Sequence, residues 1–122
     1  MRIWKYSGIY MIATGIIHNV VGFIAGWDVL GLMAQDGLFN SVTNQPDRNY
    51  IFWFLSIGFF WMILGHAFHK YLLAYNQALP AIFGWYILLF AIIGCVLMPA
   101  SGIWLFIPQA IIIILAKRNI VR

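Results

Sequence analysis

The sequence predicts an all-α integral membrane protein, and three observations support this fold class. Hydrophobic residues make up 64% of the 122 residues and charged residues only 8%, whereas soluble domains are about 45–50% apolar and 25% charged. The apolar residues form four runs, and a helix needs roughly 20 such residues to cross a bilayer. The charged residues lie at the edges of these runs. We therefore expect one transmembrane domain, residues 1–122, built as a four-helix bundle.

The four predicted spans cover residues 6–26, 50–69, 79–98 and 102–116. The first follows two basic residues, as a signal peptide would, but it is too long and lacks a small-residue cleavage site, so it should remain as a helix. The turn at residues 99–102 should lie at the outer surface. The fourth span is short and contains Pro108, which is expected to kink or shift the helix. Gln109 beside it can offer a polar group to the carbonyl that loses its partner.

Charge predicts the orientation of the bundle. The connection at residues 27–49 holds Asp28, Asp36, Asp47 and Arg48, with a net charge of −2, whereas the remaining basic residues all fall on the opposite side: Arg2, Lys5, Lys70, Lys117, Arg118 and Arg122. The positive-inside rule then places both termini in the cytoplasm, and the expected location is the bacterial inner membrane. Nucleic acid is not an expected partner, because the basic residues flank apolar runs and form no stripe.

The long outer connection contains the segment DVLGLMAQDGLF, residues 28–39. Its apolar side chains are interspersed with polar and glycine positions. We predict a short interfacial helix between the first and second spans rather than a fifth span, because the segment is too short and carries two aspartates. A connector lying on the surface is favoured over a lid above the mouth of the bundle.

Glycines mark one face of the first predicted helix. At 100° per residue, four glycines project within about 40° of one another: Gly8, Gly15, Gly22 and Gly26. Gly58 and Gly65 mark a matching stripe on the second helix. Small residues let membrane helices approach closely, so the first two helices are expected to pack through these faces.

His18 and Asn19 point into the same sector as the glycines of the first helix. Polar groups deep in a bilayer are costly and are functional candidates by default. The structural alternative, weighted equally, is that a neutral His18 bonds to another helix, either to a carbonyl or to a side chain such as Ser56.

His66 and His69 lie one helical turn apart, near the predicted cytoplasmic end of the second span. An interfacial anchor is the favoured interpretation. Ligation of haem b by His18, His66 or His69 is the main alternative, and a proton relay is another. No metal site is predicted, because zinc takes three or four ligands and neither carboxylate nor cysteine is expected on that side. The lone Cys95 forms no intrachain disulfide.

Two segments, LPAIFGWYILL at 79–89 and MPASGIWLFIPQA at 98–110, resemble a family of small bacterial four-helix membrane proteins of unknown function. The general layout of that family is similar to DoxX-like proteins. The resemblance implies a four-helix bundle without an assigned activity or catalytic residues. It also hints that Ser101 and Trp104 line the outer mouth near Asp28 and Asp47.

We therefore predict a non-enzymatic membrane protein that binds a lipophilic ligand, a quinone or a lipid, or serves as an accessory subunit of a membrane complex. Its expected partners are membrane lipids and either a second copy or a larger complex. No cofactor is predicted, with haem b as the alternative. A membrane enzyme using the loop aspartates and a small proton-coupled transporter are further alternatives. The ligand-binding candidates are His18, Asn19, Asp28, Ser101 and Trp104.

Overall fold

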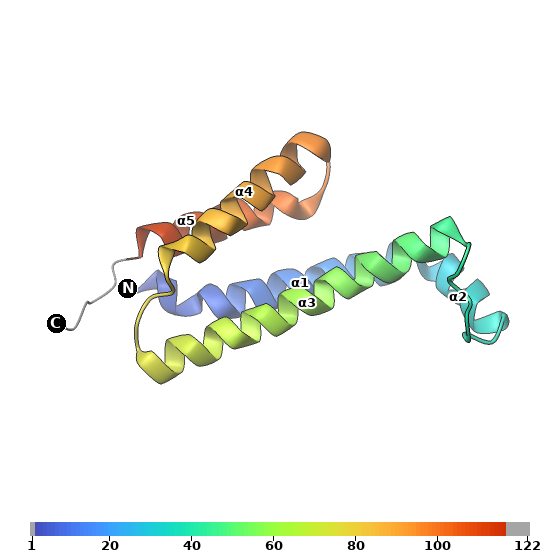
Figure 1. Cartoon of the computed structure of the whole chain (residues 1–122), viewed down its shortest axis with the longest axis horizontal. Coiled ribbons are helices and arrows are strands. Elements are labelled where there is room, and N and C mark those ends of the chain that lie inside the picture. Colours follow the sequence, from blue (N-terminus) through green and yellow to red (C-terminus); the bar gives the residue numbers. More distant parts are fainter. Residues whose placement is uncertain (1, 117–122) are drawn as a thin grey trace. The chain divides into compact units, whose positions relative to one another are not determined.

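A computed structural model describes residues 2–116, and this part of the chain is helical without a strand. It confirms the all-α class. The α-helices are α1 (Ser7–Ala25), α2 (Trp27–Gln35), α3 (Pro46–Tyr75), α4 (Ala81–Leu97) and α5 (Phe106–Leu115), shown in Figure 1. Two short 3-10 helices precede α1 and α5, namely η1 (Ile3–Tyr6) and η2 (Gly102–Leu105).

The chain divides into two compact units. Unit 1 contains residues 1–12 and 63–122, and unit 2 contains residues 13–62. The start of α1 and the end of α3 therefore belong to unit 1, together with α4 and α5. The rest of α1 and α3 belongs to unit 2, with α2 between them in sequence.

Within residues 2–116, two helical stretches are long and apolar enough to cross a membrane: Ile3–Ala25 and Pro46–Tyr75. The predicted third and fourth spans correspond to shorter apolar helices, Ala81–Leu97 and Gly102–Leu115. Helix α3 extends beyond the predicted span 50–69 at both ends. His66 and His69 consequently lie inside α3, before its end, and the connection to α4 is shorter than expected.

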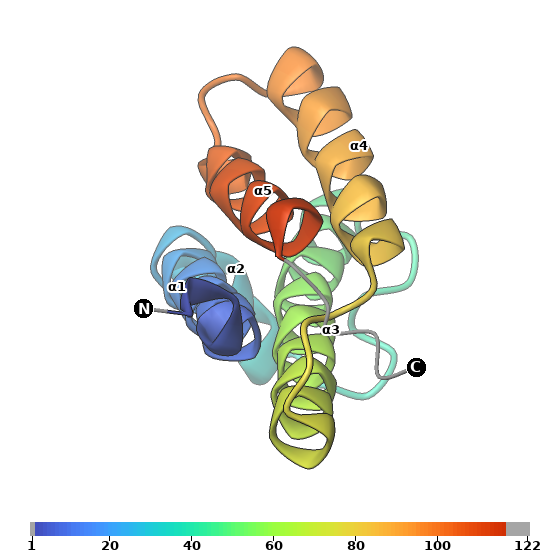
Figure 2. The same ribbon diagram turned by 90° about the vertical axis from the view of Figure 1, so that its left-hand side faces the viewer.

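In unit 1, α4 and α5 form an antiparallel hairpin whose helices lie side by side in both views (Figures 1 and 2). Close approach is possible because Gly84 has no side chain: a Cβ there would lie 2.7 Å from Ile114 Cγ1 and 2.9 Å from Ala110 O. The rings of Phe90 and Phe106 meet edge to face, with centroids 5.5 Å apart. Phe106 is one of the most buried side chains of the protein.

Pro108 lies in the first turn of α5, which begins two residues earlier at Phe106. Backbone N–H groups in a first helical turn have no partner within the helix, so proline is tolerated there. The preceding turn is the 3-10 helix η2. The expected effect of Pro108 thus takes the form of a shifted helix start.

Gln109 does not bind the carbonyl freed by Pro108, which corrects the sequence-based expectation. Its Nε2 instead donates to the Ser7 carbonyl oxygen of α1, 3.0 Å away. Gln109 is 0% exposed. A second hydrogen bond joins α1 to η2, in which Tyr10 Oη donates to the Leu105 carbonyl oxygen at 2.7 Å. Polar contacts therefore tie α5 and η2 to α1 in unit 1.

In unit 2, the predicted short helix of the outer connection is present as α2. The chain after it turns through left-handed backbone conformations at Gly37, Leu38 and Asn40. Arg48 secures this loop, because its guanidinium contacts Asp36 Oδ2 at 2.6 Å and donates to the Ser41 carbonyl at 2.9 Å.

Candidate functional site

The predicted glycine faces are in contact within each unit, as expected. In unit 1, a Cβ on Gly8 would lie 2.5 Å from His69 N and 2.7 Å from Gly65 O. In unit 2, a Cβ on Gly15 would lie 2.8 Å from Gly58 O. In each unit the backbones of the α1 and α3 segments thus approach so closely that only glycine fits.

His18 connects its segment of α1 to α3 within unit 2. Its Nε2 lies 2.8 Å from the Phe54 carbonyl oxygen. Because a carbonyl only accepts, Nε2 must carry the hydrogen and donate it. The imidazole also stacks on the Phe54 ring, with centroids 3.9 Å apart and an interplanar angle of 15°, and meets Trp61 edge-on at 4.6 Å. Of the structural alternatives expected for His18, the structure therefore shows a hydrogen bond to a backbone carbonyl of another helix.

Asn19 is 6% exposed and lies directly over Gly58. Its Oδ1 occupies the space that a Cβ on Gly58 would need. Within the described residues this oxygen has no hydrogen-bond partner. A buried acceptor without a donor lowers the stability of the fold by about 1–3 kcal/mol. Asn19 Oδ1 could therefore accept a hydrogen bond from a ligand or from water.

The other three predicted ligand-binding residues are divided between the units. Asp28 is exposed in the first turn of α2, in unit 2. Ser101 and Trp104 belong to unit 1 and close the turn between α4 and η2. Ser101 Oγ donates to the Met98 carbonyl at 2.8 Å, and Trp104 Nε1 donates to the Pro99 carbonyl at 2.8 Å. Both donor groups are thus used locally.

This geometry predicts that Ser101 and Trp104 stabilise the hairpin. Ser101 is also the N-cap residue of η2, where its Oγ accepts a hydrogen bond from Ile103 N. Ser101→Ala removes this capping side chain and should lower stability by about 0.5–2 kcal/mol. Trp104→Phe removes one neutral hydrogen bond and should cost about 0.5–1.5 kcal/mol. Unfolding of the purified full chain in mild detergent measures both losses. A variant that kept its stability but lost a bound ligand would instead place its residue in a binding site.

The three histidines are divided between the two units, with His66 and His69 in unit 1 and His18 in unit 2. His66 is exposed on α3, while His69 is half-buried and its Nδ1 has no partner among residues 2–116. Over the same residues, no group of three His, Cys, Asp or Glu side chains is arranged to hold a metal ion. His18 lies in the other unit, with its Nε2 already hydrogen-bonded.

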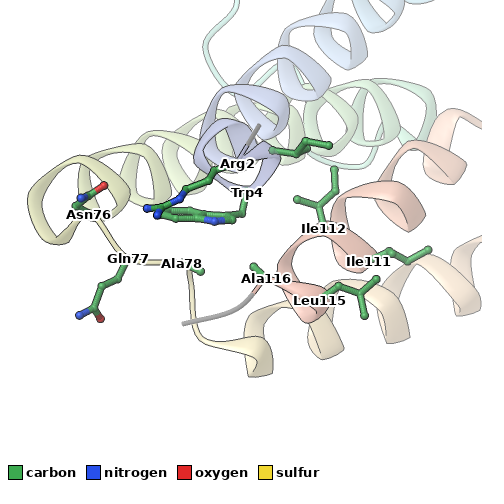
Figure 3. Close-up of a pocket in the computed structure, with 10 residues that line it drawn as sticks. Arg2, Trp4, Asn76, Gln77, Ala78, Ile111, Ile112, Leu115 and Ala116 are labelled. Atoms are coloured by element: carbon green, nitrogen blue, oxygen red, sulfur yellow. The ribbon is translucent and has the colours of Figure 1, made fainter. Parts of the chain in front are cut away.

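A pocket of about 530 Å³ opens in unit 1 between three chain segments (Figure 3). The N-terminal turn, the connection after α3 and the end of α5 each contribute to its wall. The lining residues are Arg2, Ile3, Trp4, Asn76, Gln77, Ala78, Ile111, Ile112, Leu115 and Ala116. The wall thus combines one cation and two amides with an apolar side formed largely by α5.

Local structure explains how these segments meet. Asn76 ends α3 in a left-handed conformation, with φ of +46°, which asparagine tolerates better than most residues. Helix η1 contacts α5. The hydrogen bond from Gln109 to the Ser7 carbonyl fixes α5 beside the start of α1. The turn after α3 and the N-terminal turn are thereby held at the same pocket.

Sequence reasoning missed the polar residues of this pocket. From the sequence, Arg2 and the connection that holds Asn76 and Gln77 fall on the same predicted cytoplasmic side, and none of the three is predicted to belong to a site. That shared side was the one available signal. It could not show that they meet the end of α5, because no pattern in the sequence links residues more than 30 positions apart.

Residues 2–120, nearly the whole chain, match the model of one protein family, which is described as a family of unknown function, DUF6463. Neither the search of curated proteins nor the search of solved structures gave a match.

Proposed function

The chain belongs to DUF6463, a family of unknown function, and from its own residues we propose that it is an integral membrane protein that binds a lipophilic molecule. In this proposal it performs no catalysis. The pocket of unit 1 is the observation that carries the proposal. Its volume of about 530 Å³ falls within the roughly 300–1,000 Å³ typical of small-molecule sites.

The outer surface supports a membrane location. Only 33% of the apolar window in Ile3–Ala25 and 22% of that in Pro46–Tyr75 is buried inside the protein. Large apolar side chains such as Ile24 and Val96 are about three-quarters exposed, at 74% and 75%. Soluble monomers rarely expose contiguous apolar patches above a few hundred Å². Acyl chains would provide the environment that these side chains need.

We further propose that α1, α3, α4 and the shorter η2–α5 segment all cross the bilayer, with both termini in the cytoplasm. The charge asymmetry of the connections supports this orientation. Helix α4 has 17 residues, about 26 Å at 1.5 Å per residue, which is slightly less than the roughly 30 Å hydrocarbon core. Local thinning of the bilayer accommodates such a mismatch at modest cost.

The pocket is suited to an amphiphile. Ile111, Ile112 and Leu115 offer an apolar wall, and Arg2 with Asn76 offers the polar end. The haem b alternative has less support, because ligation through His18 Nε2 would break its bond to the Phe54 carbonyl. Service as an accessory subunit is compatible with this proposal, since the lipophile would occupy only the pocket of unit 1.

The proposal is tested by native mass spectrometry of the full chain purified in mild detergent, combined with extraction of bound lipophiles. We expect a stoichiometric lipophile in the wild type. Leu115→Gln removes an apolar wall residue that is 73% exposed and should lower occupancy about 3- to 10-fold. Leu89→Gln, at an exposed α4 position outside the pocket, is the matched control and should not.

A monodisperse wild-type protein with no extractable lipophile would refute the proposal. Equal occupancy in the two variants would show that the lipophile binds elsewhere on the surface. An ultraviolet-visible spectrum of the same preparation separates the haem alternative, which requires a Soret band.

A further inference from the structure

We propose that the ligand of the unit 1 pocket is an anionic lipid, whose headgroup binds Arg2 and the Asn76 amide while its chain lies along α5. The inference rests on the proposed function and specifies the chemical class of its ligand. Three observations carry it: the charges of unit 1, the polar side of the pocket and its apolar side.

Unit 1 carries an unbalanced positive charge. The three acidic residues of the protein, Asp28, Asp36 and Asp47, all fall within residues 13–62, which form unit 2. Unit 1 has no acidic side chain, although it includes Arg2, Lys5 and Lys70. An anion that neutralises the cations of unit 1 must therefore come from outside it, and an anionic headgroup fulfils this requirement.

Arg2 is the charged residue of the pocket wall. Its guanidinium has no ion-pair partner among the described residues. The ion pair in that part of the chain joins Arg48 to Asp36. A guanidinium presents several N–H donors in a planar fork that matches two oxygens of a phosphate or carboxylate. Arg2 is exposed, so its donors are accessible to a ligand.

Asn76 and Gln77 also line the pocket, and Asn76 supplies a neutral donor on the side of this cation. Both follow the end of α3, where the left-handed conformation of Asn76 turns the chain. Side-chain NH₂ groups bind phosphate or ester oxygens without adding charge. Figure 3 shows Arg2, Asn76 and the α5 residues around the same opening, whereas the Gln77 side chain extends away from Arg2.

The apolar wall explains why a lipid is favoured over a free anion. Ile111, Ile112 and Leu115 lie within about one turn of α5 and line the pocket. A small inorganic anion would leave this surface unused, whereas an acyl chain buries it at about 25 cal/mol per Å². The charged and apolar sides together select an amphiphile.

The test compares lipid occupancy of full-length variants by native mass spectrometry, after incubation with mixed micelles containing equimolar phosphatidylglycerol and phosphatidylcholine. The wild type should retain phosphatidylglycerol about tenfold over phosphatidylcholine. Arg2→Gln should abolish this preference, and Arg2→Lys should keep part of it, because the charge remains while the fork is lost. Phosphatidylcholine occupancy should change less than twofold.

Lys5→Gln is the matched control. It removes the same charge from η1, the 3-10 helix for which Arg2 is the N-cap residue, but Lys5 does not line the pocket and its Nζ lies 5.8 Å from the Trp4 ring centroid. The control should retain phosphatidylglycerol within twofold of the wild type. An equal loss in Lys5→Gln and Arg2→Gln would overturn the inference in favour of general attraction to a basic surface.

Two further outcomes separate the possible failures. Equal retention of both lipids by the wild type would overturn the anionic headgroup but leave the proposed lipophile site standing. Retention of neither lipid would refute the proposed function itself. Inorganic phosphate at about 10 mM would saturate a weak anion site with a millimolar Kd. If it displaced phosphatidylglycerol, the pocket would be assigned to a free anion.

Discussion

Replacing Gly8 with alanine should destabilise the protein by about 1–3 kcal/mol. The added Cβ would lie 2.5 Å from His69 N and 2.7 Å from Gly65 O, and neither backbone atom can rotate away. The α1 and α3 segments of unit 1 would have to separate. Alanine is the better helix former by about 1 kcal/mol, so a net loss of stability isolates the packing effect. Unfolding of the purified chain by dodecyl sulfate, followed by circular dichroism, measures it.

Gly31→Ala provides the control for this prediction. Gly31 also lies inside a helix, α2, but a Cβ there has nothing within 4 Å. The substitution should leave stability unchanged or raise it by up to about 1 kcal/mol through helix propensity. If Gly8→Ala behaved like Gly31→Ala, the close contact between the α1 and α3 segments of unit 1 would be wrong.

Replacing Gln109 with glutamate should have the largest effect of any single substitution considered, a loss of about 3–5 kcal/mol. Gln109 is 0% exposed, and its Nε2 donates to the Ser7 carbonyl. A carboxylate would replace this donor with an oxygen facing another oxygen. It would also bury a charge without a partner. The yield of monodisperse protein extracted from membranes and its unfolding in detergent both report the loss.

Gln109→Met separates charge from shape in the same place. Methionine keeps the length of the side chain and removes both the hydrogen bond to Ser7 and the Oε1 that has no partner in the described structure. These two changes oppose each other, so the net effect should stay within about 1.5 kcal/mol. A methionine variant as unstable as the glutamate variant would mean that the hydrogen bond itself, rather than the avoidance of a buried charge, dominates at this position.

Several features of the fold follow from the sequence because they depend on local chemistry. The all-α class follows from long apolar runs that only helices could satisfy in lipid. The helical periodicity of Gly8 and Gly15, and of Gly58 and Gly65, identified the faces through which α1 and α3 meet in each unit. The short helix α2 and the shifted start of α5 at Phe106 also follow from local patterns.

The candidate site is different, because its parts are distant in sequence. His18 had several available hydrogen-bond partners, and only the packing of unit 2 selected the Phe54 carbonyl. Gln109 had a nearby partner in sequence terms, yet it binds Ser7, 102 positions away. Polar side chains choose partners by three-dimensional proximity, which periodicity along one helix does not encode.

The sequence by itself determined which segments are helical, which helix faces carry glycine and where the charges fall, since each depends on residues within a few turns of one another. Only the tertiary structure decided that Arg2, Asn76 and the end of α5 share one pocket. The physical reason is that a pocket is the space left between packed segments. Its position depends on how Gln109 holds α5 to α1 and how Asn76 turns the chain after α3, and therefore on contacts formed only when the chain has folded.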